Sequence, residues 1–262
     1  SLGILNLATG ALMESVPIDG VPGGVCLLDP QSDLVAISVQ GTAESGGSLP
    51  GVQNPHHRVE AYSLPLAEPA TRLWVHDTTQ LSYPNGLAVT PLASHYHRRN
   101  LLISDWNHHR VATIRCTDEG DWREPPLPGF AHDPYEAVVP SDEHHPERRG
   151  WRPCDVAILP TREGERSDAR FAETAPYAVA VADYYGKAVH IYLHGVSLFH
   201  EPHCERIGEL GAKRRGRASA LDRPSGLAVE VSGGDWARLL VAETGGMCVS
   251  VFHVWHERPK TG

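Results

Sequence analysis

The chain has 262 residues, a net charge of −9 with neutral histidines, and 41% hydrophobic residues. This length fits one large domain with a sizeable core. The negative balance argues against a general nucleic-acid binder, which needs a basic surface, and no apolar run is long enough for a membrane helix. The 25 glycines and 21 prolines favour a loop-rich β protein over a helical one.

The first predicted element is a short hairpin at the N-terminal end. Apolar residues mark a strand over 3–7, a turn is expected at 8–10, and a second strand is expected over 11–18. A hairpin of two strands is not stable by itself in water, so its role depends on the elements that follow.

The rest of the chain repeats one pattern in four copies. Each copy opens with a turn that contains Pro and a small residue, and continues with three short apolar runs. The runs are β-branched and bounded by Gly or Pro, which is typical of strands, and no segment shows a long helical period. The copies lie near residues 20–64, 83–116, 152–194 and 223–254.

Repetition of a small strand unit predicts a β-propeller. We therefore expect one all-β domain over 1–262, with about four recognisable blades, or more, and long loops between their strands. The N-terminal hairpin has two alternative roles. One of its strands completes the last blade and closes the ring, or the hairpin belongs to a blade whose first half is absent. The longest predicted loops cover 40–56, 118–150, 161–175 and 196–222.

The second and fourth copies resemble the NHL repeat, a family of propeller blades. The match is clearest over 84–114, and its most specific part is the Asp-Trp-Asn-His-His-Arg-Val stretch at 105–111. The first and third copies match loosely, and Asp155 stands where the family usually has Gly. The resemblance implies a rigid scaffold that presents its loops and faces to protein partners, and less often to RNA, with no cofactor. The long inserts also suit a subunit of a larger assembly, which the sequence does not separate from a scaffold.

Two groups of residues are candidates for such binding. Trp106, His108 and Arg110 lie in the predicted turn of the second copy, where an exposed aromatic ring would anchor a partner, although packing between blades also explains Trp106. Lys213, Arg214 and Arg215 form a basic run in a predicted loop, which would meet RNA or an acidic surface if it is not simply solvated.

Acidic residues end the second run in three copies: Asp105, Asp183 and Glu243. A carboxylate at this place can accept backbone N–H groups of a turn, so we expect a structural role. Arg110 and Arg58 would reach such carboxylates and link blades to one another.

A different class of function follows from a second resemblance. The Asn-Gly start of the second copy also looks like the blade start of gluconolactonase and related calcium-dependent propellers. That likeness implies a hydrolase or lyase in which Asn85, with an acid such as Asp155, holds calcium on the central axis. The first copy lacks the carboxylate of that family's first blade, and no catalytic motif is present, which favours the scaffold.

The cysteines and histidines give weaker indications. The five cysteines are scattered without a Cys-x-x-Cys pair, which favours free thiols and an intracellular, reducing compartment. Cys26, Cys154 and Cys248 fall in predicted strands, where we expect them to be buried. The His-rich and acid-rich segment over 132–147 is interpreted as a solvated loop in preference to a metal site.

Overall fold

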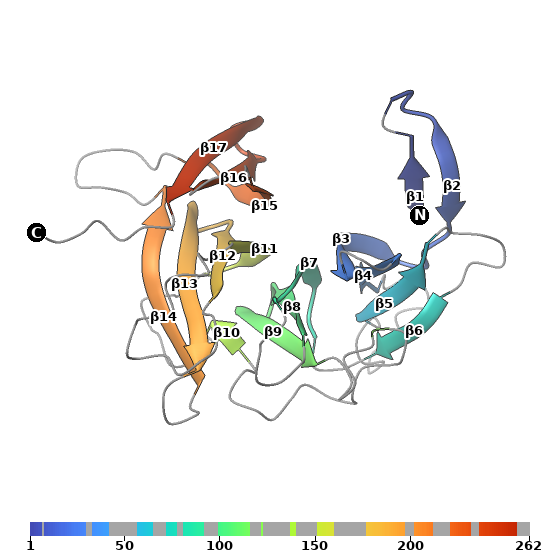
Figure 1. Cartoon of the computed structure of the whole chain (residues 1–262), viewed down its shortest axis with the longest axis horizontal. Helices are drawn as coiled ribbons and strands as arrows, with labels where there is room; N and C mark the ends of the chain where they lie inside the picture. Colours follow the sequence, from blue (N-terminus) through green and yellow to red (C-terminus); the bar gives the residue numbers. More distant parts are fainter. Residues whose placement is uncertain are drawn as a thin grey trace, which may run out of the picture.

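The computed structural model describes residues 1–6, 8–29, 33–41, 57–64, 72–77, 81–91, 99–115, 122, 137–139, 151–159, 177–196, 202–211, 221–231 and 236–255. In these residues the protein is all-β and consists of five antiparallel sheets (Figure 1). None of the described segments forms a helix suited to crossing a membrane.

The chain begins with a two-stranded sheet and continues with four meanders, in which neighbouring strands pair in chain order. The N-terminal hairpin is β1 (Leu2–Leu5) and β2 (Leu12–Val16). The first meander is β3 (Val21–Asp29), β4 (Leu34–Gln40), β5 (Arg58–Ser63) and β6 (Arg72–Asp77). The second is β7 (Pro84–Val89), β8 (Asn100–Asp105), β9 (Arg110–Arg115) and β10 (Ala137–Val139). The third is β11 (Pro153–Leu159), β12 (Tyr177–Asp183), β13 (Ala188–Val196) and β14 (Pro202–Leu210). The fourth is β15 (Pro224–Val231), β16 (Trp236–Glu243) and β17 (Cys248–Trp255).

The three strands predicted in each copy are present, and three meanders add a fourth strand. Of these, β10 and β14 lie inside segments that the sequence indicates as loops, so that part of the prediction was wrong. An outer strand has a neighbour on one side only and buries less surface, so it carries a weaker apolar pattern. The β14 sequence shows this, because charged residues interrupt its apolar positions.

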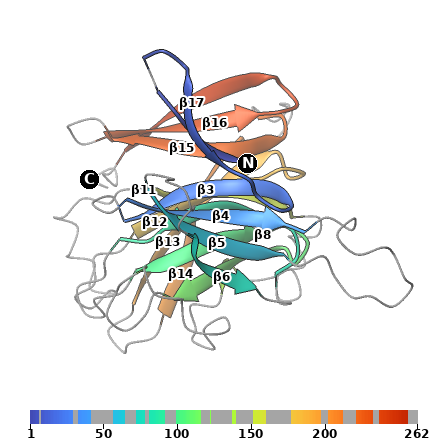
Figure 2. The same ribbon diagram turned by 90° about the vertical axis from the view of Figure 1, so that its right-hand side faces the viewer.

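The four meanders are arranged as an arc around a common centre (Figure 1). Their first strands are innermost and lie in contact in series, β3 with β7, β7 with β11, and β11 with β15. No comparable contact joins β15 to β3 among the described residues. Figure 2 shows the first meander from the side, with β3 to β6 one below another.

Apolar side chains fill the space between neighbouring meanders. Leu101 and Ile103 of β8 pack in a cluster with the first meander, whereas Leu102 between them packs with the third. This is the period of two that a strand buried on both faces imposes. A third cluster, which includes Ile191 and Leu239, joins the third and fourth meanders.

Each junction also carries a side-chain hydrogen bond near the inner strands. The buried Ser38 hydroxyl donates to the carbonyl oxygen of Asn85, and the buried Ser104 hydroxyl donates to that of Cys154 over 2.9 Å. The corresponding residue of the third meander is Ala182, which has no hydroxyl. There the Asp155 carboxylate accepts the backbone N–H of Leu227 instead.

The N-terminal hairpin does not complete the last sheet in the described residues, so that alternative is corrected. β1 and β2 pair with one another. Leu2 and Ile4 pack on Val35, Ile37 and other residues of the first meander, which follows the hairpin directly in the chain. The hairpin therefore occupies the place of a further, two-stranded member of the arc. Among the described strands, the fourth meander has no fourth strand, so β17 is its outer edge.

Candidate binding face

Three turns of the same length connect the second and third strands of successive meanders, at 106–109, 184–187 and 244–247. The last residue of each turn has a positive φ, 56° at His109, 57° at Lys187 and 51° at Met247. The turns thus share one backbone geometry. Together with the segments that lead into the first strands, at 82–83, 151–152 and 222–223, they form what we call the turn face.

The three predicted acids hold these leading segments in place. Asp105 accepts the backbone N–H of Ser82 at 2.8 Å, and Asp183 accepts that of Arg152 at 3.1 Å. Glu243 accepts the N–H of Asp222 in the same way. All three carboxylates are buried, so each satisfies a backbone donor that would otherwise be costly. The prediction of a structural role for these acids is supported by these contacts.

Two of the binding candidates, His108 and Arg110, contact the Asp105 carboxylate. Its Oδ2 lies 3.0 Å from Arg110 Nε and 2.9 Å from His108 Nδ1. Asp105 and Arg110 are direct partners in the β8–β9 register, so this ion pair lies within one sheet. Arg58 likewise pairs with Glu60 of its own strand at 2.5 Å. These two pairs fix strands and turns within a sheet, so they give no support to the interpretation that the two arginines link blades.

Trp106 is part of an aromatic group that spans two meanders. Its ring centre lies 5.5 Å from that of Tyr184 and 5.8 Å from that of Tyr185, and the two tyrosine rings are 5.2 Å apart. We call these three residues the aromatic trio. Tyr185 is 62% exposed, while Trp106 and Tyr184 are half-buried. The Arg223 guanidinium, from the segment that leads into the fourth meander, lies 6.0 Å from the centre of the Tyr184 ring.

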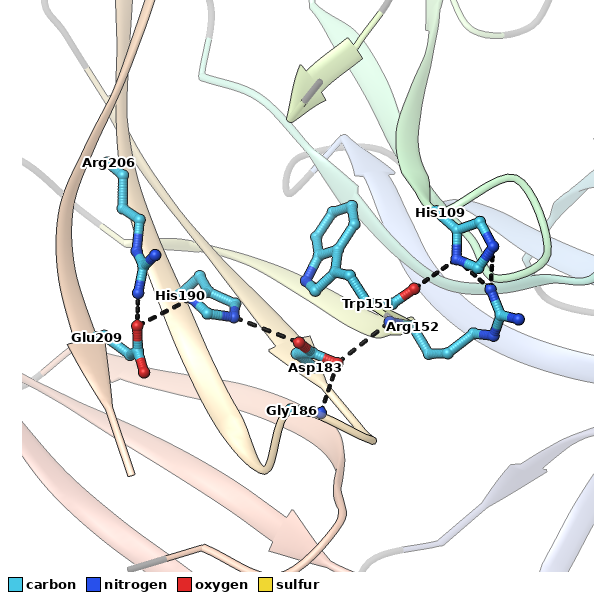
Figure 3. Close-up of polar contacts among 8 residues, drawn as sticks. All are labelled: His109, Trp151, Arg152, Asp183, Gly186, His190, Arg206 and Glu209. Atoms are coloured by element: carbon cyan, nitrogen blue, oxygen red, sulfur yellow. Dashed lines mark hydrogen bonds and ion pairs between the residues drawn. The ribbon is translucent and has the colours of Figure 1, made fainter. Parts of the chain in front are cut away.

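Polar contacts join the second and third meanders next to the trio (Figure 3). His109 Nδ1 lies 2.5 Å from the Trp151 carbonyl oxygen, and the Arg152 guanidinium lies against the His109 ring. Asp183 accepts both the Arg152 N–H and, at 3.0 Å, the Gly186 N–H. The turns at 106–109 and 184–187 are therefore fixed relative to one another.

The same group of contacts continues to the outer strand of the third meander (Figure 3). His190 lies between two carboxylates, with Nε2 3.4 Å from Asp183 Oδ2 and Nδ1 3.5 Å from Glu209 Oε2. Glu209 also pairs with Arg206. This series of contacts anchors β14 to the strand that carries Asp183.

The two candidate calcium ligands lie at the inner strands, but their oxygens are engaged by protein donors. Asn85 Oδ1 accepts from Gln40 Nε2 at 2.6 Å. Asp155 accepts the N–H groups of Val156 at 2.8 Å and Leu227 at 2.6 Å, one on each oxygen. Burial raises the pKa of Asp155 to about 6. Calcium needs several oxygens directed at one point, and this arrangement does not fit it.

Other sequence candidates are only partly accounted for. Lys213, Arg214 and Arg215 lie outside the described residues, as do the histidines of 132–147. Within the described part, no three or more His, Cys, Asp or Glu side chains are grouped to hold a metal. Cys26, Cys154 and Cys248 are free thiols. Cys154 is buried as expected, whereas Cys26 is half-buried and Cys248 is exposed on β17.

Sequence reasoning missed Tyr184 and Tyr185, and it placed Arg223 with the basic run and not beside these tyrosines. The two tyrosines occupy the turn positions that Trp106 and Asn107 occupy in the second copy. Arg223 precedes Pro224 as Tyr83 precedes Pro84, and both preceding residues have a positive φ. An alignment of the copies on their turns would have placed these residues beside Trp106, Asn107 and Tyr83.

The sequence matches no model in a scan of protein families. No relative is found among the curated proteins. A function for this chain therefore has to be argued from the turn face and from the motifs that build it.

Proposed function

We propose that this protein is an NHL-type β-propeller scaffold that binds a protein partner through its turn face. The four meanders, with their first strands innermost, have the arrangement expected of blades. The stretch at 105–111, on which the family resemblance depends most, forms the end of β8, the first turn of this face and the start of β9.

The observation that carries the proposal is the aromatic trio. Large aromatic side chains dominate the energetics of protein interfaces, and Trp and Tyr are the residues most enriched there. Trp106 comes from one meander and Tyr184 and Tyr185 come from the next, so the trio exists only in the folded protein.

The trio is also held in place before any partner arrives. Asp105 fixes the turn that carries Trp106, and Asp183 fixes the turn that carries the tyrosines. A preformed surface loses less conformational entropy on binding than a mobile one, which favours affinity.

The hydrolase alternative gains no comparable support. Asn85 and Asp155 bind N–H donors of the protein itself, and their contacts hold neighbouring meanders together. We therefore propose the scaffold and not the enzyme.

The test begins with affinity capture from a cell extract, in which the wild type is compared with the W106A/Y185A double variant. The control is L12A/M13A, which removes two apolar side chains of the hairpin that are 61% and 62% exposed, whereas Tyr185 is 62% exposed and Trp106 is half-buried. A captured protein counts only after it binds directly when both components are purified.

We expect the wild type and L12A/M13A to bind the purified partner equally. The W106A/Y185A variant should lose about tenfold or more in affinity, the effect of truncating an interface anchor. Equal binding by both variants would contradict the proposal, as would the absence of any direct partner for the folded protein.

A further inference from the structure

The turn face separates its charges into a buried and an exposed layer. The acids that end the second strands are directed inward, with 0% exposure at Asp105, 4% at Asp183 and 6% at Glu243. Each of them is bound by a backbone N–H group. These carboxylates are therefore not available to a partner at the surface.

Cationic side chains lie around the aromatic trio at the surface. Arg223 is exposed beside Tyr184, and Lys187 belongs to the same turn as the two tyrosines. Arg152 is half-buried beside His109. The exposed acid nearby is Asp222, which pairs with Lys187 at 2.6 Å, so the pKa of Asp222 is lowered. The exposed layer of the described face thus carries the cations Lys187, Arg152 and Arg223 against one acid, Asp222, above the three buried carboxylates, on a chain whose net charge is −9.

We propose, as an extension that rests on the proposed function, that the partner docks with a short acidic segment that carries one large apolar side chain. The apolar side chain lies on the trio, and flanking carboxylates pair with Arg152 and Arg223. Guanidinium groups suit carboxylates because they can donate two parallel hydrogen bonds. Charge complementarity of this kind selects the partner and speeds its association.

A single-stranded nucleic acid would also be attracted by these cations, but it suits the aromatic trio less well. Sequence-tolerant binding of bases needs open ring faces on which successive bases stack. Here Tyr184 and Tyr185 meet edge to face at 89°, and Arg223 lies over the Tyr184 ring. The trio is one compact anchoring site, and the overall negative charge opposes a long polyanion.

The inference is tested by selecting peptides from a displayed library of random 12-residue segments on the intact wild-type chain. Dissociation constants are then measured for the selected peptides and for a fluorescent 12-nucleotide oligo-dT. Two variants probe the face: R152E/R223E reverses its charge, and W106A/Y185A removes its aromatic anchor. The control R72E/R238E makes the same change in net charge away from the turn face.

We expect selected peptides with a net negative charge and one aromatic or large aliphatic residue. R152E/R223E should weaken their binding by about tenfold or more, R72E/R238E should not, and added salt should weaken the wild-type complex. Thermal unfolding verifies that each variant is folded. R223E alone, at an exposed residue, replaces the double variant if that variant does not fold.

The outcomes separate this inference from the proposed function. Peptides that lose binding in W106A/Y185A but not in R152E/R223E would overturn the acidic segment and leave the scaffold intact. Peptides insensitive to both variants would overturn both ideas at this face. If no peptide is selected, or if oligo-dT binds more tightly than every peptide, the acidic segment is wrong, and the capture experiment decides the scaffold independently.

Discussion

The Asp155 carboxylate, on the first strand of the third meander, accepts the backbone N–H of Leu227 on the first strand of the fourth over 2.6 Å. Its second oxygen accepts the N–H of Val156, so one side chain joins two sheets. At this junction Ala182, the residue equivalent to Ser38 and Ser104, offers no hydroxyl. The chain thus uses an ionisable group at a junction where its other junctions use serine.

Stability should depend on pH through Asp155. Burial raises its pKa from 3.8 to about 6, so between these values the folded protein keeps a proton that the unfolded chain has lost. Stability is therefore highest below pH 4 for this group and falls as the pH rises through 6, by about 3 kcal/mol at most. Urea unfolding from pH 4 to 7 should show this decline, and D155N should flatten it.

The D222N variant serves as the control for that measurement. The hydrogen bond and charge of Lys187 lower the pKa of Asp222. The stability that Asp222 contributes therefore increases with rising pH, whereas the stability that Asp155 contributes decreases. D222N should therefore leave the decline in place or deepen it. A D155N curve as steep as that of the wild type would show that another group is responsible.

Gly86 should not tolerate a side chain, because it lies against Asp155. A Cβ atom at this position would be 1.7 Å from Asp155 Oδ1 and 2.5 Å from its Cα. G86A should force β7 and β11 apart and cost about 3 kcal/mol or more of unfolding free energy. G208A is the matched control, since its Cβ would meet nothing closer than 3.8 Å. Equal stability of the two variants would contradict this packing.

Removal of the Asp105 carboxylate should destabilise the fold strongly. D105A would leave Arg110, His108 and the Ser82 N–H without this acceptor, at a cost of about 3 kcal/mol. Chemical denaturation measures the loss. The exposed neighbour Asn107 gives the comparison, and N107A should change stability by less than about 0.5 kcal/mol. A D105A variant as stable as N107A would rule out a structural role for this acid.

Glycine at position 247 should make the folded protein more stable than another residue without a large side chain. Met247 is 91% exposed with φ at 51°, a region that L-residues other than Gly occupy at a cost. M247G should be more stable than M247A by about 0.5 kcal/mol, since both remove the side chain and only glycine relieves the backbone. Thermal unfolding of the pair gives the answer, and an M247A variant equal to or above M247G would contradict it.

The inner strands could be predicted from the sequence because their chemistry is local. The run at Leu101, Leu102 and Ile103 is apolar without a break, which is the pattern of a strand buried on both faces. β14 could not be predicted, because an outer strand such as Pro202–Leu210 tolerates charges that hide its period.

The candidate site was predictable only in part. Trp106 could be identified from its place in one copy of the repeat, and the acids could be identified from their recurrence in three copies. The contact between Trp106 and Tyr184 could not, because it depends on how two copies are rotated against each other. The contact of Arg110 with Asp105 could be predicted, because the two residues lie opposite each other in one hairpin of the same copy.

The outer edge of β17 has a practical consequence for work with this protein. Natural edge strands usually carry a lysine, a proline or a bulge that discourages unwanted pairing. β17 has none of these, as its eight residues include no Lys, Arg, Asp, Glu or Pro and its register with β16 is regular. Val249 and Val251 are 60% and 50% exposed beside this edge. In the part of the chain that the structure describes, no strand pairs with this edge, so we expect β17 to pair with a second copy of the protein at high concentration. Unfolding measured there would report dissociation of that assembly as well as unfolding of the chain.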